Sequence, residues 1–454
     1  MLFLRFYVRG RKYSEKSFLS ALQDCISLGR NAEFNGVNPV PQIQDRQTIY
    51  SQKYLFTRHL LLNYPSKHFA SFIYQRESME ILGVNINRNA YIYDVNIKKL
   101  LNIDNGLSIL VLLVERTFIT PAWVRIKDNA TLDENYENQS WECRSEYFES
   151  KSGDRLFDEI LRKLNVFLGN RKELPDGIAI SVPGTVEGSH KILSSKRLGI
   201  VSPIDVTELF KQKKLPKCFV FHDTECMGIG EVKYGALKNS IGGNDIMQNF
   251  AYICVDEGIG STLFINGSAF KGCGSAGHIG RLIVDPRGQY NPTFSSKGSL
   301  EVYCSRPWVS TNIVGQFLAE KGKSGNLLGV NSTFRDAVLT ASEQERKWNT
   351  LPYHILAKGL ETRDPIAVSI IEEASMYLGL AVNCLLSIVH PPAIIIGGGM
   401  VTHLPSFYDS AISYARRFSW ELAWNRTVIR PSILDRKAQI LGAAELFKNK
   451  TISP

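Results

Sequence analysis

Strand-like and helix-like patterns of apolar residues alternate along most of the chain. Short apolar runs bounded by polar residues or glycine predict strands in "LSILVLLVE" (107–115), "DGIAISVPG" (176–184) and "KCFVFHD" (217–223). Amphipathic spacing predicts a helix in "SGDRLFDEILRKLNVFLG" (152–169), and two apolar runs around a glycine turn predict a hairpin in "AYICVDEGIGSTLFING" (251–267). This alternation predicts an α/β protein with two lobes.

A long apolar segment near the C-terminal end has a clear start signal. Asp364 followed by Pro365 predicts an N-cap and the first turn of a helix. The segment 365–390 is apolar on almost all sides, which predicts a buried helix that leads into the strand "PPAIIIGGGM" (391–400).

Membrane attachment is not expected from the sequence. The apolar run Ile109–Val114 is too short to span a bilayer. The start, "MLFLRFYVRG", is interrupted by Arg5 and lacks a small-residue cleavage site, so no signal peptide is expected. Eight cysteines without a CxxC pair indicate reduced thiols rather than disulfides or a thiolate zinc site. These features predict a cytoplasmic protein.

The first 78 residues have a different pattern. Helical spacing in residues 13–29 and 44–67 is followed by the strand-like "HFASFIYQ" (68–75). Two helices and a strand predict a small, mainly helical domain. The arrangement fits a winged helix-turn-helix, in which the later helix would lie in a major groove of DNA. The loop between the helices is longer than that motif usually has, so a plain accessory domain is the alternative.

Charge distinguishes this N-terminal segment from the rest. The net charge of the chain is +9. Residues 1–70 hold ten Lys or Arg and four acids, a net +6, so the other 384 residues carry only +3. A basic segment on a near-neutral body favours a polyanion partner such as duplex DNA, the alternative being a solvated basic face. The residues predicted to contact DNA are Arg46, Gln47, Thr48, Ser51, Lys53 and Arg58.

Seven motifs follow one another from residue 181 to residue 447. They are "SVPGTVEG" (181–188), "FHDTECMGIGEVKYGAL" (221–237), "VDEGIGSTLFING" (255–267), "GSAGHIGRLIVDP" (274–286), "GSLEVYCS" (298–305), "HPPAIIIGGGM" (390–400) and "ILGAAELF" (440–447). In this order they resemble the ROK family, which unites bacterial sugar kinases with sugar-responsive transcriptional repressors.

The resemblance implies a two-lobed actin-like, Hsp70-like (ribonuclease-H-like) ATPase fold over about residues 80–447. We therefore expect a DNA-binding domain at 1–78, a small ROK lobe at 79–205 with 435–454, and a large ROK lobe at 206–434.

The nucleotide half of the site departs from the family pattern. Kinases of the family have an Asp, two glycines and a Thr in a first phosphate loop, where this chain has residues 85–89, "NINRN". Asn85 lacks the carboxylate that would hold magnesium, on which phosphoryl transfer depends. Gly258 and Gly260 match the family's second phosphate turn. Asp256 and Glu257 lie beside this turn, and their charges would repel a triphosphate. The glycines that remain from the nucleotide turns are Gly258, Gly260, Gly397, Gly398 and Gly399.

The sugar half is partly retained. Asp223 matches the carboxylate that accepts a proton from the sugar hydroxyl in family kinases, so it is the catalytic candidate if the chain is a kinase. Otherwise Asp223 would accept a hydrogen bond from a bound sugar, or be only a helix N-cap. Glu301 matches another sugar-contacting acid. His222 and His278 replace family residues and are expected to bind the effector or to be ordinary hydrogen-bonded histidines.

The zinc site of most family members is expected to be absent. Arg281 replaces its histidine, and Pro292, Phe294 and Ser299 replace its cysteines. A closed tetrahedral zinc site needs all four ligands, and these side chains do not supply them. We expect neither a metal nor another cofactor, and we expect packing, for example by Tyr290 and Phe294, to hold the segment.

These observations favour a ROK-like transcriptional repressor that binds operator DNA and responds to a sugar or sugar phosphate between its lobes. A homodimer is expected from the resemblance alone. The alternatives are an ATP-dependent sugar kinase with an altered nucleotide site and a non-catalytic pseudo-kinase scaffold that binds protein.

Overall fold

The computed structural model describes residues 106–452, with gaps at 117, 128–129, 133–139, 143–152, 170, 172, 239–242, 322–331 and 345–349. Before residue 106 it describes four short strands, β1 (Tyr7–Val8), β2 (Arg11–Lys12), β3 (Ala70–Phe72) and β4 (Tyr93–Val95). The chain divides into two compact units, Met1–Gly106 and Leu107–Pro454.

In the first unit, β1 pairs with β2 and β3 pairs with β4, both antiparallel. Residues 79–106, expected to begin the small lobe, fall within this unit. The predicted helices at 13–29 and 44–67 lie outside the described residues, as do all six predicted DNA contacts and residues 85–89. The helix-turn-helix therefore stays a prediction.

The second unit contains two large sheets, and the first of them forms the centre of the small lobe. Its middle strand β5 (Leu107–Val114) pairs antiparallel with β6 (Phe118–Ile126) and parallel with β9 (Gly177–Val182). The strand order is β13-β9-β5-β6-β7, with β8 also paired to β6. The outer strands are β7 (Ala130–Leu132), β8 (Trp141–Glu142) and β13 (Cys218–His222). The three strands predicted at 107–115, 176–184 and 217–223 are confirmed.

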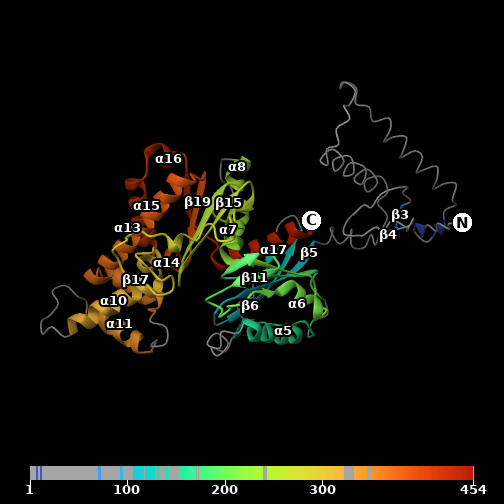
Figure 1. Ribbon diagram of the computed structural model, residues 1–454, viewed down its shortest axis with the longest axis horizontal. Coiled ribbons are helices and arrows are strands. Elements are labelled where there is room, and N and C mark those ends of the chain that lie inside the picture. The colour runs from blue at the N-terminus through green and yellow to red at the C-terminus, as the bar shows by residue number, and fades with distance from the viewer. Residues whose placement is uncertain are drawn as a thin grey trace, which may run out of the picture. The chain divides into compact units, whose positions relative to one another are not determined.

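Side chains of β5 alternate between two buried faces, as expected for a strand covered on both sides. Leu110 and Leu112 pack toward α5 (Gly153–Gly169) and α6 (Val206–Gln212), whereas Ile109 and Val111 pack toward α17 (Arg436–Ile452). These layers are visible in Figure 1. A smaller sheet adds to the core on the α5 side. Its strands are β10 (Thr185–Glu187), β11 (Lys191–Ser194) and β12 (Ile204–Asp205).

The second sheet forms the centre of the large lobe, in the order β16-β15-β14-β19-β20. β14 (Phe250–Val255) pairs antiparallel with β15 (Ile259–Ile265), which confirms the predicted hairpin, and parallel with β19 (Ala393–Gly397). The remaining strands of the lobe are β16 (Ser268–Ala269), β20 (Val428–Pro431) and the separate pair β17 (Tyr290–Asn291) and β18 (Ser296–Lys297).

The buried helix α13 (Pro365–Ile388) packs beneath this sheet, with Asp364 as its N-cap. The Asp364 carboxylate accepts hydrogen bonds from the backbone of Ile366 (3.0 Å) and Ala367 (3.1 Å), so the predicted cap is confirmed. The other helices of the lobe are α8 (Gly243–Gln248), η2 (Ile279–Arg281), α9 (Glu301–Cys304), α10 (Arg306–Lys321), α11 (Ser332–Gln344), α12 (Tyr353–Glu361), α14 (Gly399–His403), α15 (Pro405–Phe418) and α16 (Glu421–Asn425).

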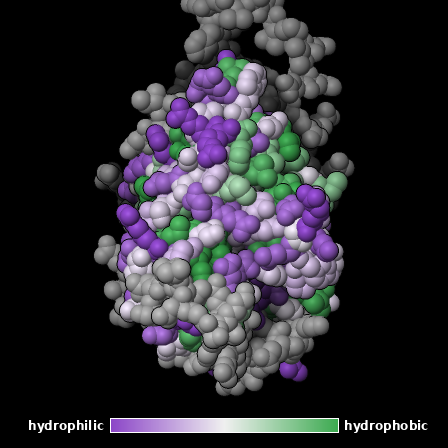
Figure 2. Space-filling view, turned by 90° about the vertical axis from the view of Figure 1, so that its left-hand side faces the viewer, coloured by the Kyte–Doolittle hydropathy of each residue, from purple (hydrophilic) through white to green (hydrophobic). Residues whose placement is uncertain are grey.

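Within the described part of the chain, α13 alone is long and apolar enough to cross a membrane. Twelve of its residues are buried in the large-lobe core, which is typical of a core helix in a globular domain. Figure 2 views one face of the protein, where polar and apolar residues alternate in small groups.

Two helices from distant parts of the sequence join the lobes. α7 (Asp223–Tyr234) follows the small-lobe strand β13 and contacts the large-lobe strands β14 and β15, while α17 packs along it (Figure 1). The helices touch through their backbones. A Cβ at Gly230 would lie 2.0 Å from the carbonyl oxygen of Ala438, and one at Gly442 would lie 1.7 Å from that of Cys226. Only glycine permits this approach.

The buried Glu231 of α7 fixes the segment that leads into α17. Its Oε1 accepts hydrogen bonds from the hydroxyl of Ser432 (2.5 Å) and from the backbone of Ile433 (3.1 Å) and Leu434 (2.8 Å). Its Oε2 accepts one from the backbone of Ala236 (2.8 Å). A buried carboxylate with four donors is well satisfied, so it sets the position of α17 relative to α7.

Candidate functional site

The first turn of α7 forms one wall of the candidate site. Because β13 ends at His222, the helix begins at Asp223, whose Oδ1 accepts a hydrogen bond from the backbone of Thr224 (2.7 Å). Asp223 is thus the first residue of α7 rather than its N-cap, and 22% of its side chain is exposed. Its second carboxylate oxygen is available to a ligand or to water.

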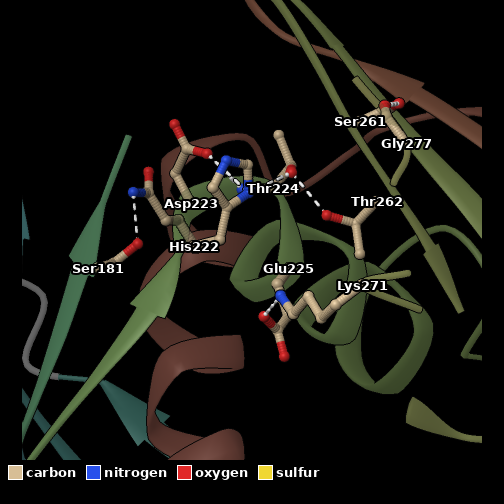
Figure 3. Close-up of polar contacts among 10 residues, drawn as sticks. Ser181, His222, Asp223, Thr224, Glu225, Ser261, Thr262, Lys271 and Gly277 are labelled. Atoms are coloured by element: carbon tan, nitrogen blue, oxygen red, sulfur yellow. Dashed lines mark hydrogen bonds and ion pairs between the residues drawn. The ribbon is translucent and has the colours of Figure 1, made fainter. Parts of the chain in front are cut away.

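Thr224 links this wall to the large-lobe sheet. Its hydroxyl lies 2.8 Å from Nδ1 of His222 and 2.7 Å from the hydroxyl of Thr262 on β15 (Figure 3). Nδ1 of His222 is also 3.3 Å from Oδ1 of Asp223. In the same first turn of α7, Glu225 forms an ion pair with Lys271. The polar groups at the start of α7 are therefore held by partners from the large-lobe segment 261–271.

His222 and His278 face each other across a small cavity. Their ring centroids are 6.2 Å apart and their planes are nearly perpendicular. Burial, and then the charges of His222 and Arg281, lower the pKa of His278, so its imidazole is neutral at pH 7. Gly184, Thr185 and Val186 of the small lobe close the other side. The cavity measures about 20 Å³, room for about one water molecule.

Glu301, the first residue of α9, contacts the start of β15. Its Oε2 accepts a hydrogen bond from the backbone of Ile259 (3.3 Å). Burial raises the pKa of Glu301. A Cβ built on Gly258 would lie 2.9 Å from this oxygen and 3.1 Å from Nη2 of Arg197.

Arg197 was not predicted from the sequence as a site residue, yet it lies among the predicted ones. Although Arg197 is exposed, desolvation by the surrounding protein acts to lower its pKa, and the carboxylates of Glu257, Asp223 and Asp256 outweigh this and raise it. The only local signal is the pair Lys196–Arg197 in a loop before a glycine.

Protein side chains lie against the turns that the sequence matches to the family's nucleotide loops. Tyr353 donates a 2.5 Å hydrogen bond to Oδ1 of Asp256, and its ring stacks on His403 with 4.6 Å between centroids. The guanidinium of Arg306 lies 4.6 Å from the centre of the Tyr353 ring and 3.5 Å from Oε1 of Glu257. Tyr353 also lies against the glycine turn, because its Oη would be 2.1 Å from a Cβ at Gly399.

Additional acids gather near the second phosphate turn. Glu115, in the β5–β6 turn, pairs with Arg436 at 2.6 Å. Burial raises the pKa of Glu115, Arg436 opposes this rise, and Asp256 and Glu257 add to it. Burial and Asp256 likewise raise the pKa of Asp435. Asp256 and Glu257 were expected at this turn from the sequence. Glu115 and Asp435 were not predicted, because they come from distant segments of the chain.

The glycines predicted as nucleotide-loop remnants have structural roles. Gly258 belongs to the tight β14–β15 turn, in which its carbonyl accepts from the backbone of Asp256 (3.0 Å), whereas Gly260 lies in β15 and pairs with Cys254. Gly397 ends β19, and Gly398 has φ +91° as the N-cap of α14, which begins at Gly399. A strand-to-helix turn of this shape favours glycine without any ligand.

The segment that replaces the family's zinc ligands is held by polar and stacking contacts. The guanidinium of Arg281 lies 4.3 Å from the centre of the Phe294 ring, and Asn291 donates to the hydroxyl of Ser299 (3.0 Å). Tyr290 is exposed. No cluster of three or more His, Cys, Asp or Glu suited to a metal occurs among the residues that the structure describes.

A larger hollow lies elsewhere in the small lobe, along β5, β6 and β7. It measures about 550 Å³ and contains none of the predicted site residues. Of the residues predicted for the effector, His222 and His278 line the small cavity and Asp223 adjoins His222. Glu301 contacts the start of β15 instead.

Comparisons with known proteins agree with the motifs. A model of the ROK family matches residues 137–450. A glucokinase of Halalkalibacterium halodurans is 26% identical over 286 residues, 62% of this chain and 79% of that protein. A xylose repressor of Bacillus spizizenii is 22% identical over 304 residues, 66% of this chain and 69% of that protein.

Solved structures agree on the fold. A ROK family transcriptional regulator, described as a homolog of the E. coli MLC protein, has a TM-score of 0.59 and 18% identity, covering 88% of this chain and 89% of its own. A ROK family glucokinase from Streptomyces griseus, in complex with glucose and AMPPNP, has a TM-score of 0.56 and 17% identity. The match covers 75% of this chain and 98% of the glucokinase chain.

Proposed function

Because this chain belongs to the ROK family, we propose that it is a sugar-responsive transcriptional regulator rather than a sugar kinase. Its N-terminal unit binds operator DNA, and its second unit binds a sugar or sugar phosphate between the lobes. It acts in the cytoplasm as a homodimer, without a cofactor. The xylose repressor and the regulator of known structure are its relatives in this class.

One observation carries the proposal: protein side chains lie against the turns that match the family's nucleotide loops. Tyr353 lies against Gly399 of the Gly398–Gly399 turn, and both Arg306 and His403 pack on its ring. Asp256, Glu257 and Glu115 gather where phosphates would approach the second phosphate turn. Phosphoryl transfer needs phosphates positioned by backbone amides and a metal, and like charges at close range oppose that arrangement.

Effector response follows from the size of the cavity. About 20 Å³ is far below the roughly 300 Å³ that small-molecule pockets usually offer, so a sugar binds only when the lobes move apart. A ligand shifts such an equilibrium by its differential affinity for the two arrangements. The effector then contacts Asp223, Glu301, His222 and His278, and the change in lobe angle alters operator affinity.

DNA binding is tested with the full-length protein and a duplex recovered from a random library. Binding at several salt concentrations gives a slope of log affinity against log salt, which reports the number of phosphate contacts. We expect Lys53→Gln/Arg58→Gln to weaken binding about tenfold and to flatten the slope by about 2, since each lost contact removes about 0.9.

The matched control is Lys213→Gln/Lys214→Gln, which removes the same charge from exposed positions of the small lobe. It should bind DNA as the wild type does. Absence of DNA binding, or binding that is insensitive to salt, would contradict the regulator function and favour a protein-binding scaffold.

The second candidate function is a sugar kinase, which the accessible carboxylate of Asp223 and the glucokinase relative favour. A coupled assay with ATP, magnesium and a panel of hexoses decides between the two. Turnover that Asp223→Asn abolishes would establish the kinase. Thermal-shift screening of sugars, sugar phosphates and nucleotides identifies the ligand, since a ligand of the folded state raises the melting temperature.

A further inference from the structure

The loop Ser195–Ile200 of the small lobe is a rigid turn. Ser195 and Ile200 exchange two backbone hydrogen bonds of 2.9 Å, and the Ser195 hydroxyl accepts from the backbone of Leu198 (3.3 Å). Leu198 and Ile200 are fully buried in the small-lobe core. The loop therefore holds the backbone of Lys196 and Arg197 in place at the surface while its base stays in the core.

Both side chains reach the large lobe. Nζ of Lys196 donates a 2.5 Å hydrogen bond to the carbonyl of Thr293. Nη2 of Arg197 lies over Gly258, only 3.1 Å from where a Cβ would be. The absence of a side chain at Gly258 therefore admits a guanidinium from the other lobe, a use of this glycine that needs no phosphate.

Electrostatic attraction favours the same contact. Glu257, Asp223 and Asp256 all raise the pKa of Arg197, and the carboxylate of Glu301 lies beside it over Gly258. None of the carboxylates in the described residues is within ion-pair distance of this guanidinium, so several acids share its charge. Without that charge the acids would repel one another across the cleft.

We propose that Lys196 and Arg197 form a clasp that holds the two lobes closed, and that a ligand must displace Arg197 to reach Asp223 and Glu301. The clasp is a property of the second unit alone, whereas naming the displacing ligand an effector rests on the proposed function. Ligand affinity and lobe opening are then linked, because both depend on releasing the same two side chains.

Amide hydrogen exchange on the full-length protein, without ligand or DNA, tests the clasp. In Lys196→Met/Arg197→Met we expect exchange at least tenfold faster than in the wild type at residues 255–262 and 290–301. Tenfold corresponds to about 1.4 kcal/mol of lost protection. Exchange in β19 should not change, because that strand lies in the large-lobe core away from the clasp.

Lys213→Met/Lys214→Met is the matched control, since it removes two exposed charges from the same lobe, and it should exchange like the wild type. Wild-type exchange rates in both cleft segments of the clasp variant would overturn the proposal. If β19 also exchanges faster, the fold itself is weakened, and Arg197→Gln alone is then measured against the same criterion.

Salt provides an independent measurement. Raising the salt from 0.05 M to 1 M shortens the screening length from somewhat over 10 Å to about 3 Å, so it should speed exchange of the cleft segments in the wild type. It should not speed exchange in the clasp variant, because the two charges are gone and screening only weakens the remaining repulsion between the acids. Equal salt responses in both proteins would overturn the clasp. Failure of DNA or sugar binding would refute the proposed function and leave these results unchanged.

Discussion

The hydroxyl of Tyr353 donates a 2.5 Å hydrogen bond to Oδ1 of Asp256, joining α12 to the β14–β15 turn. The two residues are 97 positions apart in the sequence. Burial, followed by the carboxylate of Asp256, raises the pKa of Tyr353, so the phenol stays protonated and remains a donor. This contact keeps an aromatic ring over the glycine turn that follows β19.

Tyr353→Phe removes the donor and leaves the ring in place. We expect the free energy of unfolding to fall by about 1.5–3 kcal/mol, because the hydrogen bond is made to a carboxylate and the change leaves Asp256 with one partner fewer. Urea unfolding of the full-length protein, followed by tryptophan fluorescence, measures the change.

Tyr290→Phe is the control, since Tyr290 is exposed on β17. It should change the free energy of unfolding by less than about 0.5 kcal/mol, as is usual for exposed positions. Equal stabilities of the Tyr353→Phe variant and the wild type would show that the contact with Asp256 does not stabilise the large lobe.

Elements with a strong local pattern could be predicted from the sequence. The run Ile109–Val114, the hairpin around Gly258 and the cap of α13 at Asp364 each depend on neighbouring residues, so periodicity and capping rules suffice. The motifs also placed His222 and His278 in one site, and the two rings line the same cavity.

Long-range contacts of the site could not be predicted in this way. Arg197, Tyr353 and Glu115 lie on three separate segments, and no local pattern marks any of them as a site residue. Their roles come from the folding of two sheets against each other, which brings charged turns together. The tight helix contact at Gly230 and Gly442 is hidden for the same reason.

The lowered pKa of His278 predicts a stability change on the acid side of neutrality. The unfolded chain takes up a proton near the ordinary histidine pKa of 6.5, whereas the folded chain does so only at lower pH. Stability due to this residue is therefore present above pH 6.5 and is lost as the pH falls from 6.5 to the lower pKa of the folded state. We expect His278→Asn to lose less stability than the wild type between pH 7 and pH 5.

Urea unfolding at several pH values measures this difference. His354→Asn is the control, because His354 is exposed on α12, and it should follow the wild-type profile. Identical pH profiles for His278→Asn and the wild type would contradict the assignment of a neutral, partly buried imidazole.

The raised pKa of Glu301 predicts that stability depends on pH in the opposite direction. Burial raises its pKa above the ordinary 4.5, so the folded state holds the proton more tightly than the unfolded state. Its contribution to stability therefore falls as the pH rises through 4.5 toward the folded pKa. Glu301→Gln, which keeps an oxygen for the backbone of Ile259, should gain stability relative to the wild type as the pH rises from 4 to 7. The exposed Glu361→Gln should show no such gain, and a constant difference across this range for Glu301→Gln would refute the prediction.

Gly230 and Gly442 predict that the contact between the two lobe-joining helices does not tolerate even a methyl group. A Cβ at either position would meet a carbonyl oxygen of the facing helix at 2.0 Å or less, so the helix backbones must separate. We expect Gly230→Ala and Gly442→Ala each to lower the free energy of unfolding by about 1–3 kcal/mol through overpacking. Gly315→Ala on α10, where a Cβ meets nothing within 4 Å, should instead stabilise by about 0.5–1 kcal/mol through helix propensity. All three changes add the same methyl group within a helix, and urea unfolding measures the change in the free energy of unfolding for each. A loss at Gly230 and Gly442 with a gain at Gly315 would show that the helix contact is the cause. A change of the same sign at all three positions would refute this prediction.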